Sequence, residues 1–143
     1  MKTWHWVPVV AMAVGLWGID VAIAADAPAM AAAEVKTLLN DKTLFMVDRA
    51  QGRSYGNAVR MYFAPDGSLA AQSSSGMSNS GTWEVKEDGL MCNTWRDDRW
   101  RASWCYTLHR DGDDVDFIAT TASPQAFTGL KWVMKSSKDG NQM

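Results

Sequence analysis

Histidine and cysteine, the residues that most often hold metals or carry acid–base and nucleophilic chemistry, are scarce in this chain. Its 143 residues include two of each, and His5 lies at the extreme N-terminus. The serine-rich stretch 73–80 contains no Gly-x-Ser-x-Gly segment, and the sequence has no Cys-x-x-Cys pair and no glycine-rich phosphate loop. We therefore expect no metal, no cofactor and no catalytic residue.

The chain also lacks an excess of positive charge. Lys and Arg number 14 against 16 Asp and Glu, which gives a net charge of -2. Proteins that bind the phosphate backbone need a basic surface, so nucleic acid is not an expected partner. With 47% hydrophobic and 21% charged residues, the composition is that of one compact domain. Eight Trp and nine Met are the unusual counts.

Residues 1–24 have the pattern of a secretory signal peptide. Lys2 precedes an apolar stretch from Val7 to Ile19, and Ala22-Ile23-Ala24 is a small-x-small cleavage site. The stretch is shorter than the roughly 20 residues that a spanning helix needs, which disfavours the alternative of a retained membrane anchor. We expect a periplasmic or secreted protein without a membrane span after cleavage. The cleaved chain would form a single β-rich domain over residues 25–135, followed by a flexible tail over 136–143.

Cys92 and Cys105 are predicted to form a disulfide, because export to an oxidising compartment favours pairing. If they face each other across a hairpin, the register puts the cysteines on one, largely polar face. The opposite, largely apolar face holds Met91, Asn93, Trp95, Ala102, Trp104 and Tyr106. Such a bond would stabilise the fold by about 3 kcal/mol. A redox role is the less favoured alternative, since nothing nearby activates a thiolate.

The remaining pattern predicts one helix and then strands. Ala31 to Leu39 is rich in helix formers, with an apolar stripe at Val35, Leu38 and Leu39. Asp-Gly turns then separate short strand-like runs. The expected runs are 43–47, 57–63, 68–72, 81–86, 90–95, 102–109, 114–119 and 130–135. We therefore expect a mainly β fold in which a short N-terminal helix precedes an antiparallel meander of about eight strands. The meander would close into a barrel of the calycin or lipocalin kind or pack as a sandwich. Residues 73–80, rich in Ser and Gly, are expected to form an exposed, mobile loop.

Several of these segments resemble a family of small secreted proteobacterial proteins that is classed as a domain of unknown function. The resemblance rests on AAEVKTLL near the start, YFAPDG at 62–67, Gly81-Thr82-Trp83, the two cysteines, and Arg110-Asp111-Gly112. It spans roughly residues 31–132, and the chain departs from it at 48–57 and after Gln72. It implies export and a compact β-rich fold, and it transfers no catalytic residue.

The most distinctive local feature is an aromatic and basic cluster between the cysteines. Arg side chains stacked on Trp could recognise a carbohydrate, a peptide or an anionic partner. The alternative is a hairpin tip at which Trp95 points to the core while the arginines pair with Asp97 and Asp98. The candidate contact surface comprises Trp95, Arg96, Arg99, Trp100 and Arg101.

Three other groups have a structural interpretation that we prefer. His109 could act as a general base, but a solvated histidine at a strand end is the simpler explanation. The acidic run Asp111–Asp116 lacks the order of a calcium loop and is better explained as a hairpin turn, although cation binding there stays open. Methionines in four predicted strands (Met46, Met61, Met91 and Met134) fit core filling better than soft-metal ligation.

Two function classes remain from the sequence. The favoured one is an exported, non-catalytic, monomeric barrel-like protein that binds a small ligand or an envelope protein. The alternative is a small periplasmic enzyme that uses dispersed carboxylates or His109.

Overall fold

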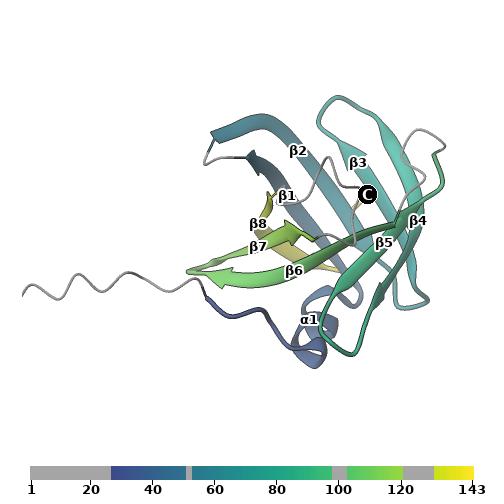
Figure 1. The fold of residues 1–143 in the computed structure, drawn as a ribbon. Helices are drawn as coiled ribbons and strands as arrows, with labels where there is room; N and C mark the ends of the chain where they lie inside the picture. The colour runs from purple at the N-terminus through teal and green to yellow at the C-terminus, as the bar shows by residue number, and fades with distance from the viewer. Residues whose placement is uncertain (1–26, 51–52, 98–102, 121–130) are drawn as a thin grey trace, which may run out of the picture.

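The architecture is taken from a computed structural model that describes residues 27–50, 53–97, 103–120 and 131–143 (Figure 1). The predicted signal peptide at 1–24 lies outside the described residues, as do Arg99, Trp100 and Arg101 of the candidate contact surface. Within the described ranges, no helix is long and apolar enough to cross a membrane.

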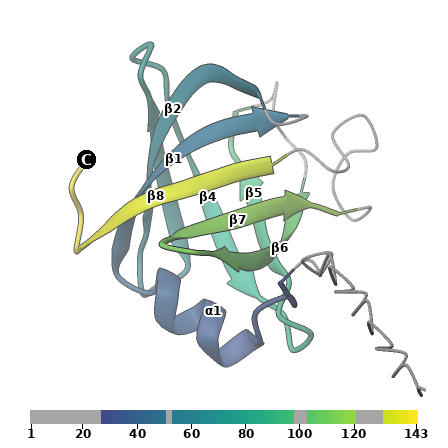
Figure 2. The same ribbon diagram turned by 90° about the vertical axis from the view of Figure 1, so that its left-hand side faces the viewer.

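Eight antiparallel strands form a closed barrel in which each strand pairs with its neighbours in the chain and β8 pairs with β1 (Figures 1 and 2). This confirms the predicted meander and selects the barrel over the sandwich. Closure gives every strand two partners, so no sheet edge is left exposed. The strands are β1 (Lys42–Ala50), β2 (Arg53–Phe63), β3 (Ser68–Ser73), β4 (Ser78–Val85), β5 (Met91–Trp95), β6 (Ser103–Asp111), β7 (Asp114–Ala119) and β8 (Lys131–Asp139).

The predicted Asp-Gly turns join the strands at one end of the barrel. In the β2–β3 turn the Asp66 carboxylate accepts hydrogen bonds from Ser68 N at 2.8 Å and from Ser68 Oγ at 2.6 Å. These bonds hold the pKa of Asp66 below its usual value. In the β4–β5 turn Gly89 has φ +88°, and a Cβ there would lie 2.6 Å from Met30 O. Glycine is thus required at this turn both by its backbone conformation and by the chain packed against it.

Helix α1 (Ala32–Leu39) lies across the same end of the barrel (Figures 1 and 2). Its buried face carries Val35 and Leu39, each 0% exposed, which confirms two members of the predicted apolar stripe. Just before the helix, Met30 N donates to Leu108 O at 2.7 Å and ties the N-terminal segment to β6. The buried side chains in this half of the barrel include Leu44, Phe63, Leu69, Leu108 and Val115. The helix and these side chains fill one end of the barrel.

Several strands are longer than predicted, and in two places the extension replaces an expected loop or tail. The expected loop at 73–80 is shorter, because Ser73 ends β3 and Ser78 already begins β4, with Gln72 paired to Ser78. The expected tail at 136–143 is strand as far as Asp139, four residues beyond the expected domain end. In both places polar residues form strand because the neighbouring strand supplies backbone partners. The start of β1, for example, would otherwise have no partner on its β8 side.

Candidate ligand-binding cavity

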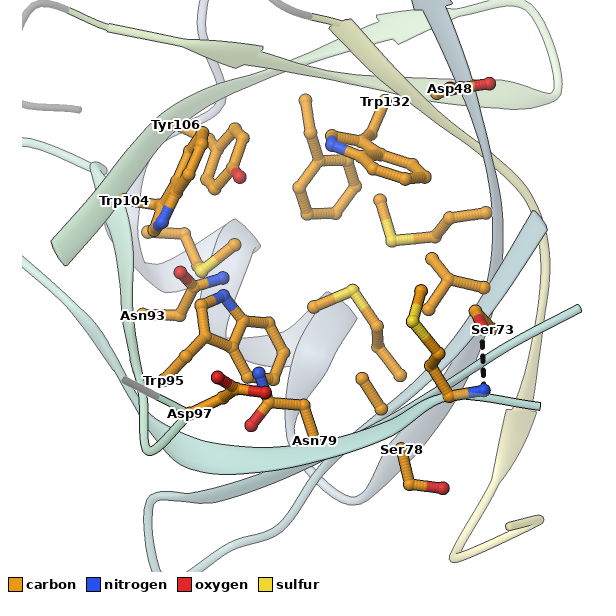
Figure 3. Close-up of a pocket in the computed structure, with 17 residues that line it drawn as sticks. Asp48, Ser73, Ser78, Asn79, Asn93, Trp95, Asp97, Trp104, Tyr106 and Trp132 are labelled. Carbon is orange, nitrogen blue, oxygen red and sulfur yellow. Dashed lines mark hydrogen bonds between the residues drawn. The ribbon is translucent and has the colours of Figure 1, made fainter. Parts of the chain in front are cut away.

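The barrel encloses a cavity of about 370 Å³ (Figure 3). Its lining includes the last residue of β3, Ser73, the first two residues of β4, Ser78 and Asn79, and the last residue of β5, Trp95. These positions lie at the end of the strands opposite to the Asp-Gly turns. The cavity therefore occupies the half of the barrel that α1 does not fill.

Aromatic and methionine side chains form most of the cavity wall. The aromatic members are Trp95, Trp104, Tyr106, Phe117 and Trp132, and the methionines are Met46, Met61, Met77 and Met91. Three of the four methionines singled out in the sequence thus line the cavity, and the fourth, Met134, packs in the same hydrophobic core cluster. Methionine adapts its shape readily, and aromatic rings offer large apolar faces, so this wall suits an apolar molecule.

Asn93 is the one amide deep in this wall. Its side chain is 2% exposed and faces the cavity from β5, with Trp95 and Trp104 beside it (Figure 3). Among the described residues, none donates a hydrogen bond to Asn93 Oδ1. A buried acceptor without a partner is costly, by about 1–3 kcal/mol. Such an atom calls for an explanation within the site.

Tyr106 brings a second polar group to the cavity. Its ring packs edge-on against Phe117, with centroids 6.4 Å apart, and its hydroxyl points towards the cavity centre (Figure 3). Burial raises the pKa of the Tyr106 phenol above its usual value, because the ionised form would lose its hydration. The group therefore stays a neutral O–H at ordinary pH and can donate a hydrogen bond.

Polar residues gather at the rim. Ser73 Oγ accepts a hydrogen bond from Met77 N at 3.1 Å, and Asn79 Oδ1 accepts one from Ser80 N at 2.8 Å. Met77 is 61% exposed, so the cavity reaches the surface beside the β3–β4 hairpin. The described lining contains two carboxylates, Asp48 and Asp97, and no Lys, Arg or His. The described part of the lining thus offers no cation that would neutralise an anionic ligand.

The hairpin that carries the cavity wall has the predicted register. Cys92 lies directly opposite Cys105, and the two are joined by a disulfide. Five of the six side chains predicted for the apolar face of this hairpin line the cavity: Met91, Asn93, Trp95, Trp104 and Tyr106. The sixth, Ala102, lies outside the described residues. The disulfide therefore staples the two strands from outside the cavity.

Of the candidate contact surface, the structure describes Trp95 and Arg96. Trp95 lines the cavity, whereas Arg96, the next residue, is exposed. Arg96 follows the last residue of β5, and it does not line the cavity. Trp95 thus occupies the core-facing position of the alternative hairpin interpretation, and it is part of the cavity.

The remaining candidates lie on the outer wall. One ring nitrogen of His109, Nδ1, lies 2.6 Å from Ala27 O and the other, Nε2, 3.0 Å from Thr107 Oγ1. In the acidic run, Asp114 pairs with Lys135 and Asp116 pairs with Lys131. Within the described part of the chain, no group of three or more His, Cys, Asp or Glu side chains could hold a metal. None of these residues lines the cavity.

The sequence favoured a barrel that binds a small ligand, but it left open whether the barrel holds a cavity. A signal was present, since Asn93 is the only uncharged polar residue on an otherwise apolar hairpin face. Comparison of the chain with models of known protein families and with curated proteins gives no match. The resemblance to the secreted proteobacterial family stays a prediction.

Proposed function

We propose that this chain is an exported, non-catalytic barrel that binds one small, largely apolar and uncharged molecule in its cavity. The observation that carries the proposal is the cavity of about 370 Å³ with its aromatic and methionine wall. Protein interiors are normally close-packed, and voids larger than a water molecule are few. A ligand in an apolar space of this size would supply the packing contacts that its wall otherwise lacks.

The volume sets the size of the occupant. An engineered cavity of about 150 Å³ is known to bind benzene, and ligand pockets start at roughly 300 Å³. This cavity is more than twice the benzene size, which suits a molecule of two or three fused rings or an equivalent branched hydrocarbon. The absence of a basic side chain from the described lining favours a neutral ligand over a fatty acid or another anion.

Two observations support the non-catalytic, exported part of the proposal. His109, Asp114 and Asp116 lie outside the cavity, and the two carboxylates of its described lining, Asp48 and Asp97, have no His beside them in that lining. The Cys92–Cys105 disulfide is typical of proteins that mature in an oxidising compartment, which agrees with the predicted signal peptide.

A fluorescence titration with N-phenyl-1-naphthylamine, a neutral probe of apolar sites, tests the proposal. The wild-type protein should bind one probe molecule with increased emission. Ala71 is 8% exposed and lines the cavity, so Ala71→Phe should fill part of the space and weaken binding at least tenfold. Ala70, its neighbour on β3, does not line the cavity, and Ala70→Phe should bind as the wild type does.

The two phenylalanine variants add the same apolar surface to adjacent positions. Equal binding by both would place the probe outside the cavity, and no saturable binding by the wild type would refute the proposed function.

A further inference from the structure

Resting on the proposed function, we infer that the ligand is a fused-ring aromatic molecule whose N–H or O–H group donates a hydrogen bond to Asn93 Oδ1. The ligand class thus narrows from any small apolar molecule to a planar ring system with a polar hydrogen.

The first step is the state of the amide. Asn93 is 2% exposed, and Oδ1 has no hydrogen-bond partner among the described residues. Its cross-strand partner is Trp104, and its neighbours on the same face of β5 are Met91 and Trp95. An apolar residue at this place would complete the wall without leaving a buried acceptor. Asparagine is therefore a costly choice for the fold alone, and a donor from the ligand removes that cost.

The second step is the shape of the wall around the amide. Trp95 and Trp104 flank Asn93, Tyr106 lies beside Trp104 on the same hairpin, and Trp132 lies across the cavity (Figure 3). Flat aromatic faces and edges pack best against another ring, in offset or edge-to-face contact. A rigid fused ring also loses little conformational freedom on binding, whereas a flexible chain of equal volume loses more.

The third step is the choice of a donor. Asn93 Oδ1 can only accept, so the group that meets it must carry a polar hydrogen. The neutral Tyr106 hydroxyl can in turn donate to a ligand oxygen or ring nitrogen. A phenol or a similar hydroxylated ring can satisfy both, because its oxygen donates one hydrogen bond and accepts another.

Isothermal titration with a matched pair of ligands tests the inference. 2-Naphthol carries the O–H donor, and 2-methylnaphthalene replaces it by a methyl group of similar size. The ratio of their dissociation constants is measured for the wild type and for Asn93→Leu. The ratio cancels the general affinity of each variant for naphthalene rings. In Asn93→Leu we expect this ratio to shift by about fivefold to tenfold, because 2-naphthol loses affinity relative to 2-methylnaphthalene. This is the size of effect expected for one buried hydrogen bond.

Asn93→Ala is the second variant, because alanine fits any wall that accommodates asparagine. It enlarges the space equally for both ligands, so the same change of ratio is expected. The matched control is Thr94→Leu, at the next position of β5, where the side chain is exposed and does not line the cavity. This variant should leave the ratio as in the wild type.

The outcomes separate the two claims. A ratio that changes by less than twofold in both Asn93 variants overturns the hydrogen bond but leaves the cavity as the binding site. Binding of N-phenyl-1-naphthylamine without binding of 2-naphthol also overturns the inference and spares the proposed function. If neither naphthalene ligand nor N-phenyl-1-naphthylamine binds, the proposed function itself fails.

Discussion

Replacing Asn93 by leucine should make the empty protein more stable. The wild-type residue is 2% exposed and leaves Oδ1 without a partner among the described residues, and such a buried acceptor costs about 1–3 kcal/mol. Leucine removes that cost, and its additional volume can extend into the cavity of about 370 Å³ without overpacking the wall. We expect the free energy of unfolding to rise by about 1–2 kcal/mol.

Urea denaturation followed by circular dichroism measures this change, with the wild type and Asn93→Leu compared at the same protein concentration and with no ligand added. For a domain of this size, each kcal/mol corresponds to a shift of about 3–5 °C in Tm, which thermal unfolding checks independently. Asn79→Leu is the matched control. Its amide oxygen already accepts from Ser80 N at 2.8 Å, so leucine there removes a satisfied bond and should not stabilise.

A loss of 1 kcal/mol or more in Asn93→Leu, with the control unchanged, would refute the reasoning. It would mean that the amide is needed by the fold and not kept for a ligand. Stabilisation of both variants would show instead that leucine is favoured at any position of this wall.

Three further predictions concern the barrel itself. Changing Cys92 and Cys105 together to alanine should lower the free energy of unfolding by about 3 kcal/mol in urea denaturation, because the disulfide closes a loop between residues 13 apart. An unchanged midpoint would contradict a stabilising role of the disulfide. Gly81→Ala should destabilise the protein by about 2 kcal/mol or more in the same assay, because its Cβ would lie 2.0 Å from Thr94 O. In the control Gly76→Ala the added Cβ meets nothing within 4 Å, so the variant should lose only about 1–2 kcal/mol, which is due to its positive φ. Equal losses in the two glycine variants would argue against close contact between β4 and β5. The raised pKa of Tyr106 should make stability fall as pH rises above about 10, because the unfolded phenol ionises there while the folded one stays protonated. Tyr106→Phe should reduce this alkaline loss in denaturation measurements, and an identical loss in the variant would exclude Tyr106 as its source.

Much of the barrel could be predicted from local patterns. Alternating side chains and Asp-Gly turns located all eight strands, and the spacing of Cys92 and Cys105 gave the correct register of the β5–β6 hairpin. The pairing of β8 with β1 could not be read from the chain in this way. Residues 136–139 carry no apolar signal, and they form strand only because the start of β1 offers them backbone partners.

The cavity was harder to predict than the fold. The cavity volume is the space inside the barrel that the inward-facing side chains of all the strands leave unfilled. No single stretch of the sequence determines that volume. The apolar face of the β5–β6 hairpin was identified, but an inward Trp95 or Trp104 can fill a core as well as line a space. Asn93 was the informative residue, because a lone amide on such a face has a cost that packing does not explain.

The most direct test of the account is the position of a bound ligand, measured by NMR on protein labelled with ¹³C at the methionine methyl groups. Met46, Met61 and Met91 line the cavity, whereas Met30 is buried in the core outside it and Met143 ends the chain. Addition of 2-naphthol should shift the first three methyl signals through the ring current of the ligand and leave Met30 and Met143 in place. Shifts confined to Met30 or Met143, or no shift at the three cavity methionines at saturating 2-naphthol, would contradict ligand binding inside the barrel.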